Sequence, residues 1–112
     1  MKSDYLSKSL YLRGLQCPKS LFLCKSGVEG RRSAAAKARL DAGTDVGRIA
    51  RDLFPGGTEI PYQGVPIREQ ITRTKALIEE GATVLYEPAF CHDGVFVKVD
   101  ILRKVENKWN IY

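Results

Sequence analysis

The feature that most constrains this chain is an Asp-Gly pair, Asp93-Gly94, placed between two apolar runs near the C-terminus. The runs cover residues 84–90 and 95–102, and both are rich in β-branched and aromatic residues. Asp-Gly favours a type I′ turn, because that turn needs positive φ at both central residues. The sequence therefore predicts a β-hairpin, followed by a turn near Glu106-Asn107 and a third strand over residues 109–112.

The position of the turn determines which residues face each other. With Asp93-Gly94 as the loop, His92 pairs with Val95, and Glu87 lies opposite Asp100. Facing acids repel, so they are either two surface acids of a solvated sheet or a site for a cation. Mg²⁺ takes oxygen ligands and keeps several waters, which suits two neighbouring carboxylates.

A second register stays open, with His92-Asp93 as the loop. Glu87 would then face Lys98 in an ordinary cross-strand ion pair. In the first register Lys98 shares a face of its strand with Asp100, because side chains alternate along a strand, and it could meet a phosphate there.

The first half of the chain has helical patterns. Residues 7–16 are expected to form a helix that Ser7 or Ser9 can cap, and a second helix is expected over residues 18–25, starting at Pro18. A long helix begins near residue 33, with an interruption allowed at Gly43-Thr44, and it ends at residues 54–57, which read FPGG. Its apolar residues recur at helical steps: Leu40, Val46, Ile49, Ala50 and Leu53.

Arg48 and Arg51 lie off this apolar stripe; in a nuclease they could face the substrate, but the solvated surface is the expected location. After a short strand over residues 58–62, a helix over residues 69–80 ends at Gly81 and leads directly into the first hairpin strand. Four apolar residues of this part are expected to face inward: Ile67, Ile71, Leu77 and Ile78. The expected fold is a single α/β domain, in an α+β arrangement, over residues 1–112. Its helical region covers residues 1–57, and residues 58–112 supply one helix and a three-stranded antiparallel meander.

The net charge of +5 weakly favours a polyanionic partner. The densest positive cluster consists of Arg31, Arg32, Lys37 and Arg39. Such residues bind a nucleic-acid backbone without sequence preference, and they are equally typical of a solvated linker and first helical turn.

Several classes of protein are excluded by what the chain lacks. It has no Gly-rich phosphate loop, and a single histidine, His92, gives no catalytic triad. At the hairpin tip, His92 is expected to be polar surface rather than a ligand. Three cysteines without a C-x-x-C spacing indicate reduced thiols. No apolar run is long enough for a membrane span, so the cytoplasm is the expected location.

The order of YEPAF (86–90), a hairpin, VKVDIL (97–102), a turn and WNIY (109–112) resembles the core of the RecB-like branch of the PD-(D/E)XK nuclease superfamily, near the CRISPR-associated exonucleases. The resemblance implies a restriction-endonuclease-like core and DNA cleavage with Mg²⁺ or Mn²⁺. Asp100 matches the metal-binding Asp of that family, and Glu87 matches its upstream acid. The family's Glu-x-Lys motif would follow Tyr112. We therefore expect residues 1–112 to be the N-terminal portion of a nuclease domain, with little activity by themselves.

The segment LSKSLYLRGLQCPKSLFL (6–23) is similar to the opening of the same relatives. Cys17 matches the N-terminal cysteine of their iron–sulfur cluster, and the other cluster cysteines would have to come from outside this chain. In GTDVG (43–47), Gly47 stands where the family often has a histidine.

Two other classes remain alternatives: a non-catalytic nucleic-acid-binding module and a protein-interaction module. The unpaired strand over residues 109–112 also predicts self-association, since an open strand edge tends to recruit a partner.

Overall fold

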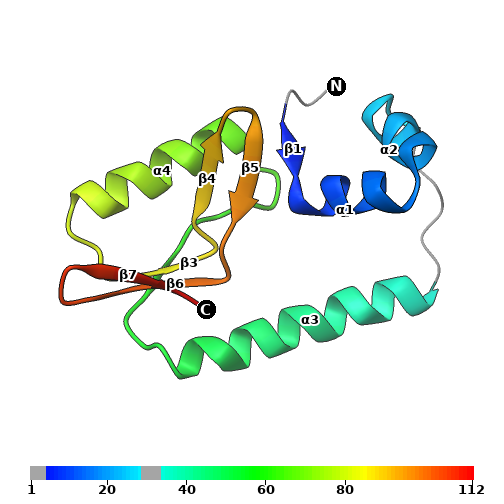
Figure 1. The fold of residues 1–112 in the computed structure, drawn as a ribbon. Helices are drawn as coiled ribbons and strands as arrows, with labels where there is room; N and C mark the ends of the chain where they lie inside the picture. Colours follow the sequence, from blue (N-terminus) through cyan, green and yellow to red (C-terminus); the bar gives the residue numbers. More distant parts are fainter. Residues whose placement is uncertain (1–4, 29–33) are drawn as a thin grey trace.

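The computed structural model describes residues 5–28 and 34–112, which form a mixed α/β structure (Figure 1). The helices are α1 (Lys8–Gln16), α2 (Pro18–Lys25), α3 (Ala34–Asp52) and α4 (Ile67–Glu79). The strands are β1 (Leu6–Ser7), β2 (Thr58–Glu59), β3 (Val84–Tyr86), β4 (Ala89–His92), β5 (Val95–Lys98), β6 (Ile101–Val105) and β7 (Lys108–Ile111).

The hairpin of β4 and β5 turns at Asp93-Gly94, as predicted. Both residues have positive φ, 48° for Asp93 and 77° for Gly94. His92 pairs with Val95, which is the first of the two registers considered. The same register continues beyond the hairpin, where Tyr86 of β3 pairs with Ile101 of β6.

The ladder is interrupted at Glu87-Pro88. Glu87 has φ of 58°, in the left-handed region, and Pro88 has no N–H to donate. Two backbone hydrogen bonds cross the break, from Glu87 N to Asp100 O and from Val99 N to Pro88 O, both 3.1 Å. The break turns one long hairpin into two sheets.

Each sheet gains a short parallel strand: β1, which the sequence pattern did not predict, and β2, which covers the first two residues of the strand predicted over residues 58–62. β1 pairs with β5, giving the order β1-β5-β4, and β2 pairs with β3, giving the order β2-β3-β6-β7. The predicted single three-stranded meander is therefore found only in part. The antiparallel pairs are present, and the turn at Glu106-Asn107 joins β6 to β7, but the strands are divided between two mixed sheets.

The first two helices form a hairpin with the predicted bounds. The Ser7 hydroxyl caps α1 by accepting from the backbone N–H of Leu10 at 3.3 Å. Gly14 of α1 allows α2 to approach closely, since a Cβ at Gly14 would lie 2.7 Å from Cδ2 of Leu21.

The buried core lies between the sheets and α4. Leu85, Val99 and Leu102 are its centre, and Leu77 and Ile78 of α4 pack against them. The buried residues of α4 are polar, however: Gln70 and Thr74. The Thr74 hydroxyl donates to Gln70 O and accepts from the N–H of Ala89, both at 2.9 Å, so it joins α4 to the start of β4.

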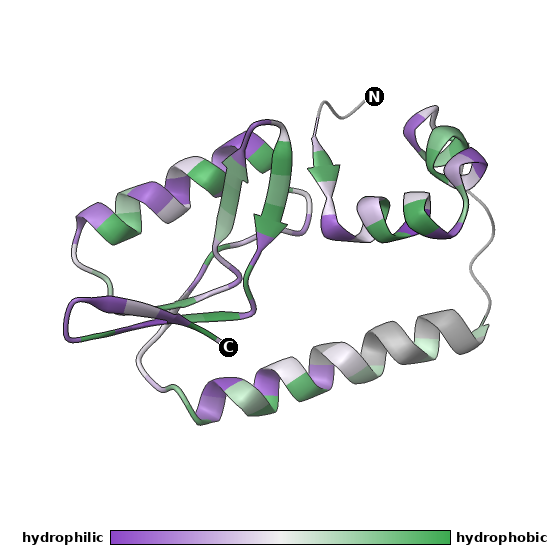
Figure 2. Cartoon of the chain, viewed as in Figure 1, coloured by the Kyte–Doolittle hydropathy of each residue, from purple (hydrophilic) through white to green (hydrophobic). Residues whose placement is uncertain are grey.

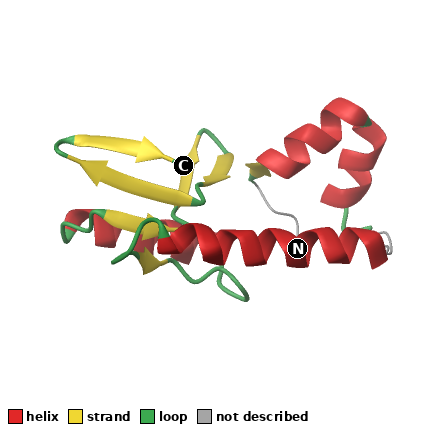
Figure 3. Cartoon of the chain, turned by 90° about the horizontal axis from the view of Figure 1, so that it is seen from below, coloured by secondary structure: helices red, strands yellow, loops and turns green. Residues whose placement is uncertain are grey.

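Helix α3 runs without interruption through Gly43-Thr44 and extends well beyond the sheets (Figures 1 and 3). Its C-terminal half carries apolar residues (Figure 2), but Val46 and Ile49 are 66% and 67% exposed, and Leu53, directly after the helix, is 75% exposed. Three residues of the predicted apolar stripe are therefore exposed, whereas Ala50 is half-buried and the side chain of Leu40 is not described.

The end of α3 is joined to the sheet by Tyr86. The Tyr86 hydroxyl donates to the carbonyl of Phe54 and accepts from the N–H of Gly57 at 3.1 Å. Gly57 must be small, because a Cβ there would lie 2.3 Å from Cζ of Tyr86.

Candidate metal and phosphate site

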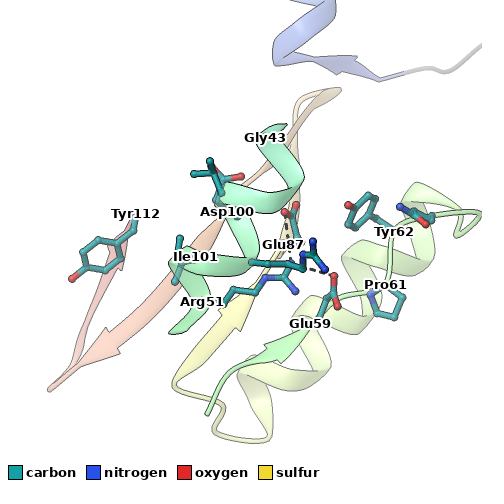
Figure 4. A pocket seen from close by; sticks show the side chains of 14 residues that line it. Gly43, Arg51, Glu59, Pro61, Tyr62, Glu87, Asp100, Ile101 and Tyr112 are labelled. Carbon is teal, nitrogen blue, oxygen red and sulfur yellow. Dashed lines mark hydrogen bonds and ion pairs between the residues drawn. The ribbon is translucent and has the colours of Figure 1, made fainter. Parts of the chain in front are cut away.

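A cleft of about 810 Å³ lies beside the C-terminal half of α3 (Figure 4). Arg48 and Arg51 of α3 line one side of it. The other lining side chains that matter for chemistry come from β2 and the segment after it, and from the break in the ladder: Glu59, Tyr62, Glu87 and Asp100.

The structure brings the two predicted acids to this one cleft. Glu87 and Asp100 occupy facing positions, joined by the hydrogen bond from Glu87 N to Asp100 O, and both side chains line the cleft. Glu87 is half-buried and Asp100 is exposed. Two carboxylates that open on one space can take part in binding a hard cation.

The Glu87 carboxylate is held by two cations. Its Oε2 lies 3.3 Å from Nζ of Lys98, and its Oε1 lies 4.0 Å from Nη2 of Arg51. Lys98 is two residues from Asp100, so it is the diagonal neighbour of Glu87, and a long side chain reaches that far. Glu87 thus faces Asp100 by backbone register while its side chain pairs with Lys98.

Each of these cations also lies over an aromatic ring. Nζ of Lys98 is 3.6 Å from the ring centroid of Tyr62, and Cζ of Arg51 is 4.9 Å from that of Tyr86. Arg51 further donates to Oε1 of Glu59 at 3.2 Å, so its guanidinium lies between two carboxylates (Figure 4). These contacts restrain both cationic groups beside the Glu87 carboxylate.

Arg51 was expected on the solvated surface, and that expectation is wrong. Its side chain is 24% exposed, because Glu59, Glu87 and the Tyr86 ring, all from the sheet, draw it inward. The expectation for Arg48 is confirmed: it is exposed, and it pairs with Asp45 on its own helix.

The two acids are too few for a closed metal cage. Across residues 5–28 and 34–112, no three metal-ligating side chains gather in one place. Mg²⁺ is often bound by one or two carboxylates, with water and substrate oxygens completing its shell, and Glu87 and Asp100 can supply that part.

The pairing of β6 with β7 shows which residue would lie beside Asp100 if β7 were longer. Ile101 and Tyr112 exchange backbone hydrogen bonds, 3.3 Å from Ile101 N to Tyr112 O and 2.9 Å in the other direction. A residue that continued β7 past Tyr112 would therefore lie beside Asp100.

The other predicted site residues lie apart from this cleft or outside the description. Arg31 and Arg32 lie outside the described residues, and Lys37 and Arg39 are backbone positions of α3 whose side chains are not described. Cys17 is exposed at the junction of α1 and α2. No disulfide forms among the described cysteines, which are Cys17, Cys24 and Cys91.

Two further residues concern the resemblance. His92 is at the hairpin tip, with its side chain 92% exposed and 3.4 Å from Asp93. It does not line the cleft. Gly47 does line the cleft, one helical turn before Arg51. A Cβ added at Gly47 would have no neighbouring atom within 4 Å.

None of the described helices combines the length and the apolar character that crossing a bilayer requires. Comparisons with protein-family models, with curated proteins and with solved structures found no match to the chain.

Proposed function

We propose that this chain is the N-terminal portion of a metal-dependent DNA nuclease of the RecB-like type, acting in the cytoplasm. One observation carries the proposal: Glu87 and Asp100, the two acids that match the family pattern, occupy facing positions and open on one cleft. The positive charge of the chain, +5, agrees with a polyanionic substrate.

In this proposal Asp100 and Glu87 hold Mg²⁺ or Mn²⁺ over the cleft. A divalent ion bound there supplies Lewis acidity to a phosphodiester and makes water a better nucleophile. Lys98 contacts the DNA backbone, as do the four basic residues around the start of α3: Arg31, Arg32, Lys37 and Arg39. The remaining acid and the lysine of the Glu-x-Lys motif come from residues after Tyr112, at the position beside Asp100. An iron–sulfur cluster that includes Cys17 would likewise need cysteines from outside these residues.

The experiment compares residues 1–112 with the parent gene product that continues past Tyr112. We expect the longer protein to cleave DNA with Mg²⁺ or Mn²⁺ and residues 1–112 to cleave very little. In the longer protein, Asp100→Asn should lower the rate by at least about 100-fold, because metal contributions to such reactions amount to several kcal/mol. Asp93→Asn, the same change at the exposed hairpin tip, is the matched control. Full activity in Asp100→Asn, or rapid cleavage by residues 1–112, would refute the proposal.

A second candidate function is nucleic-acid binding without catalysis. It is favoured by the neutralisation of Glu87 by Lys98 and Arg51, which leaves this carboxylate engaged within the protein. A DNA-binding titration at several salt concentrations separates the candidates. Affinity that falls steeply with salt, with no cleavage by the longer protein, would favour the binding module. No binding even at low salt would leave a protein-interaction module.

A further inference from the structure

Two cations from distant parts of the chain converge on one carboxylate at the cleft. Arg51 belongs to α3 and Lys98 to β5, and their side chains meet only at the two oxygens of Glu87. The three side chains are 23–24% exposed, so water and small solutes reach them. One arginine and one lysine around a single anion form an arrangement that proteins use for phosphate groups.

The two cations have supports that do not depend on Glu87. Lys98 rests on the ring of Tyr62, and Arg51 rests on the ring of Tyr86 and donates to Glu59. If the Glu87 carboxylate moved away, both cations would keep these contacts. Their positions are therefore suited to receive another anion.

Glu87 itself is held in an unfavourable backbone conformation. Its φ of 58° lies in the left-handed region, which residues with a side chain adopt rarely and at a cost. The break in the ladder places its carboxylate against Arg51 and Lys98 despite this cost.

The geometry points to a phosphate-binding subsite formed by Arg51 and Lys98, which the Glu87 carboxylate occupies when no ligand is bound. A phosphate or phosphodiester group displaces Glu87 and takes over its two ion pairs. The released carboxylate is then free to bind a divalent ion together with Asp100, and the ion would offset the repulsion between the two acids. This subsite rests on the proposed function, in which a phosphodiester is the ligand of the cleft. Binding of the phosphodiester would release Glu87, which could then act together with Asp100.

The test measures phosphate binding without any metal. Inorganic phosphate is titrated into residues 1–112 in EDTA at constant ionic strength, and the backbone amide NMR signals of Arg51, Glu87 and Lys98 are followed. In Glu87→Gln the competing charge is removed, so phosphate affinity should rise by about fivefold, the range expected for a partly exposed ion pair. Arg51→Gln and Lys98→Gln should each weaken binding by about fivefold or more.

Glu69→Gln is the matched control for net charge. Glu69 forms an exposed ion pair with Arg73 on α4 at 2.6 Å, and it does not line the cleft. This variant should bind phosphate with less than about a twofold change. Circular dichroism shows whether each variant is folded. Should Glu87→Gln fail to fold, the phosphate affinities of Arg51→Gln and Lys98→Gln decide whether the subsite exists.

Equal affinities in Glu87→Gln and Glu69→Gln, or wild-type affinity in Arg51→Gln, would overturn the subsite. The outcome is independent of the nuclease proposal, because no metal and no cleavage enter the measurement. Phosphate binding with these variant effects, but no DNA cleavage by the longer protein, would keep the subsite and remove the nuclease.

Discussion

The sheet region and helix α3 both carry regularly spaced apolar residues, but these residues have very different surroundings. In the region of β2–β7 and α4, apolar residues such as Leu85 are fully buried. In the described part of α3, the apolar residues at helical spacing are mostly exposed, with Val46 and Ile49 at 66% and 67%. Periodicity predicts which residues share a face of a helix, but whether that face is covered depends on the rest of the fold.

The same comparison indicates which changes should affect stability and which should affect the cleft. The sheet region has the core, whereas the cleft lies where α3 meets the sheet, held by Tyr86 and by the ion pairs of Arg51. Changes in the core should therefore affect unfolding, and changes at the junction should mainly affect the cleft.

The largest expected effect is in the core. Leu85→Ala should lower the free energy of unfolding by about 2–5 kcal/mol, because it removes a fully buried side chain and leaves a cavity. Ile49→Ala, on the exposed face of α3, should change it by less than about 0.5 kcal/mol. Urea denaturation measures both. Similar losses of unfolding free energy in the two variants would mean that the Ile49 face of α3 is covered in solution, so that the two regions would not differ.

The second largest effect is expected at the buried hydrogen bond between Thr74 of α4 and Ala89 of β4. Thr74→Val leaves the N–H of Ala89 without its partner, which should cost about 1–3 kcal/mol. Thr72→Val is the control, since Thr72 is exposed and its hydroxyl only donates to the carbonyl of Arg68 on the same helix. We expect the same urea experiment to show a much smaller loss for Thr72→Val. If both variants unfolded alike, the link between α4 and β4 would not be important.

The junction of α3 and the sheet is tested by Tyr86→Phe. The variant loses two hydrogen bonds, to Phe54 and from Gly57, and should be destabilised by about 1 kcal/mol. Amide exchange at Gly57 should become faster than in the wild type. Tyr11→Phe, at an exposed tyrosine of α1, should change neither quantity. Unchanged exchange at Gly57 in Tyr86→Phe would show that the junction is held by other contacts.

The smallest effect is expected at the open edge of the larger sheet. β7 is the last strand of that sheet, so weak self-association through this edge is expected. Ile111 lies at a position whose N–H points away from β6, because its neighbour Tyr112 exchanges hydrogen bonds with Ile101. Ile111→Pro should therefore reduce dimerisation without breaking the β6–β7 pairing. A wild-type mass that stays monomeric at every concentration in sedimentation analysis would contradict this expectation.

Local signals in the sequence predicted the hairpin well. Asp93-Gly94 specifies a turn by its own backbone preferences, and the register of Glu87 with Asp100 follows from that turn alone. The bounds of α1 and α2 followed from Ser7 and Pro18 in the same way.

Features that depend on distant partners could not be predicted. The parallel strand β1 has only two residues, which is too short for a pattern, and of the strand predicted over residues 58–62 only the two residues of β2 pair with β3. Thr74 is buried because a backbone N–H of β4 needs an acceptor, and Arg51 is drawn into the cleft by acids that lie elsewhere in the sequence. The burial of Thr74 and the position of Arg51 both result from tertiary packing.

Binding of Mn²⁺ tests most directly whether Glu87 and Asp100 form part of a metal site. Mn²⁺ is paramagnetic, so it broadens NMR signals near its binding site. Titrated into residues 1–112, it should broaden the amide signals of Glu87, Asp100 and Ile101 first, and Asp100→Asn should abolish that selectivity. Broadening that begins elsewhere, or that is the same in wild type and Asp100→Asn, would contradict the metal site.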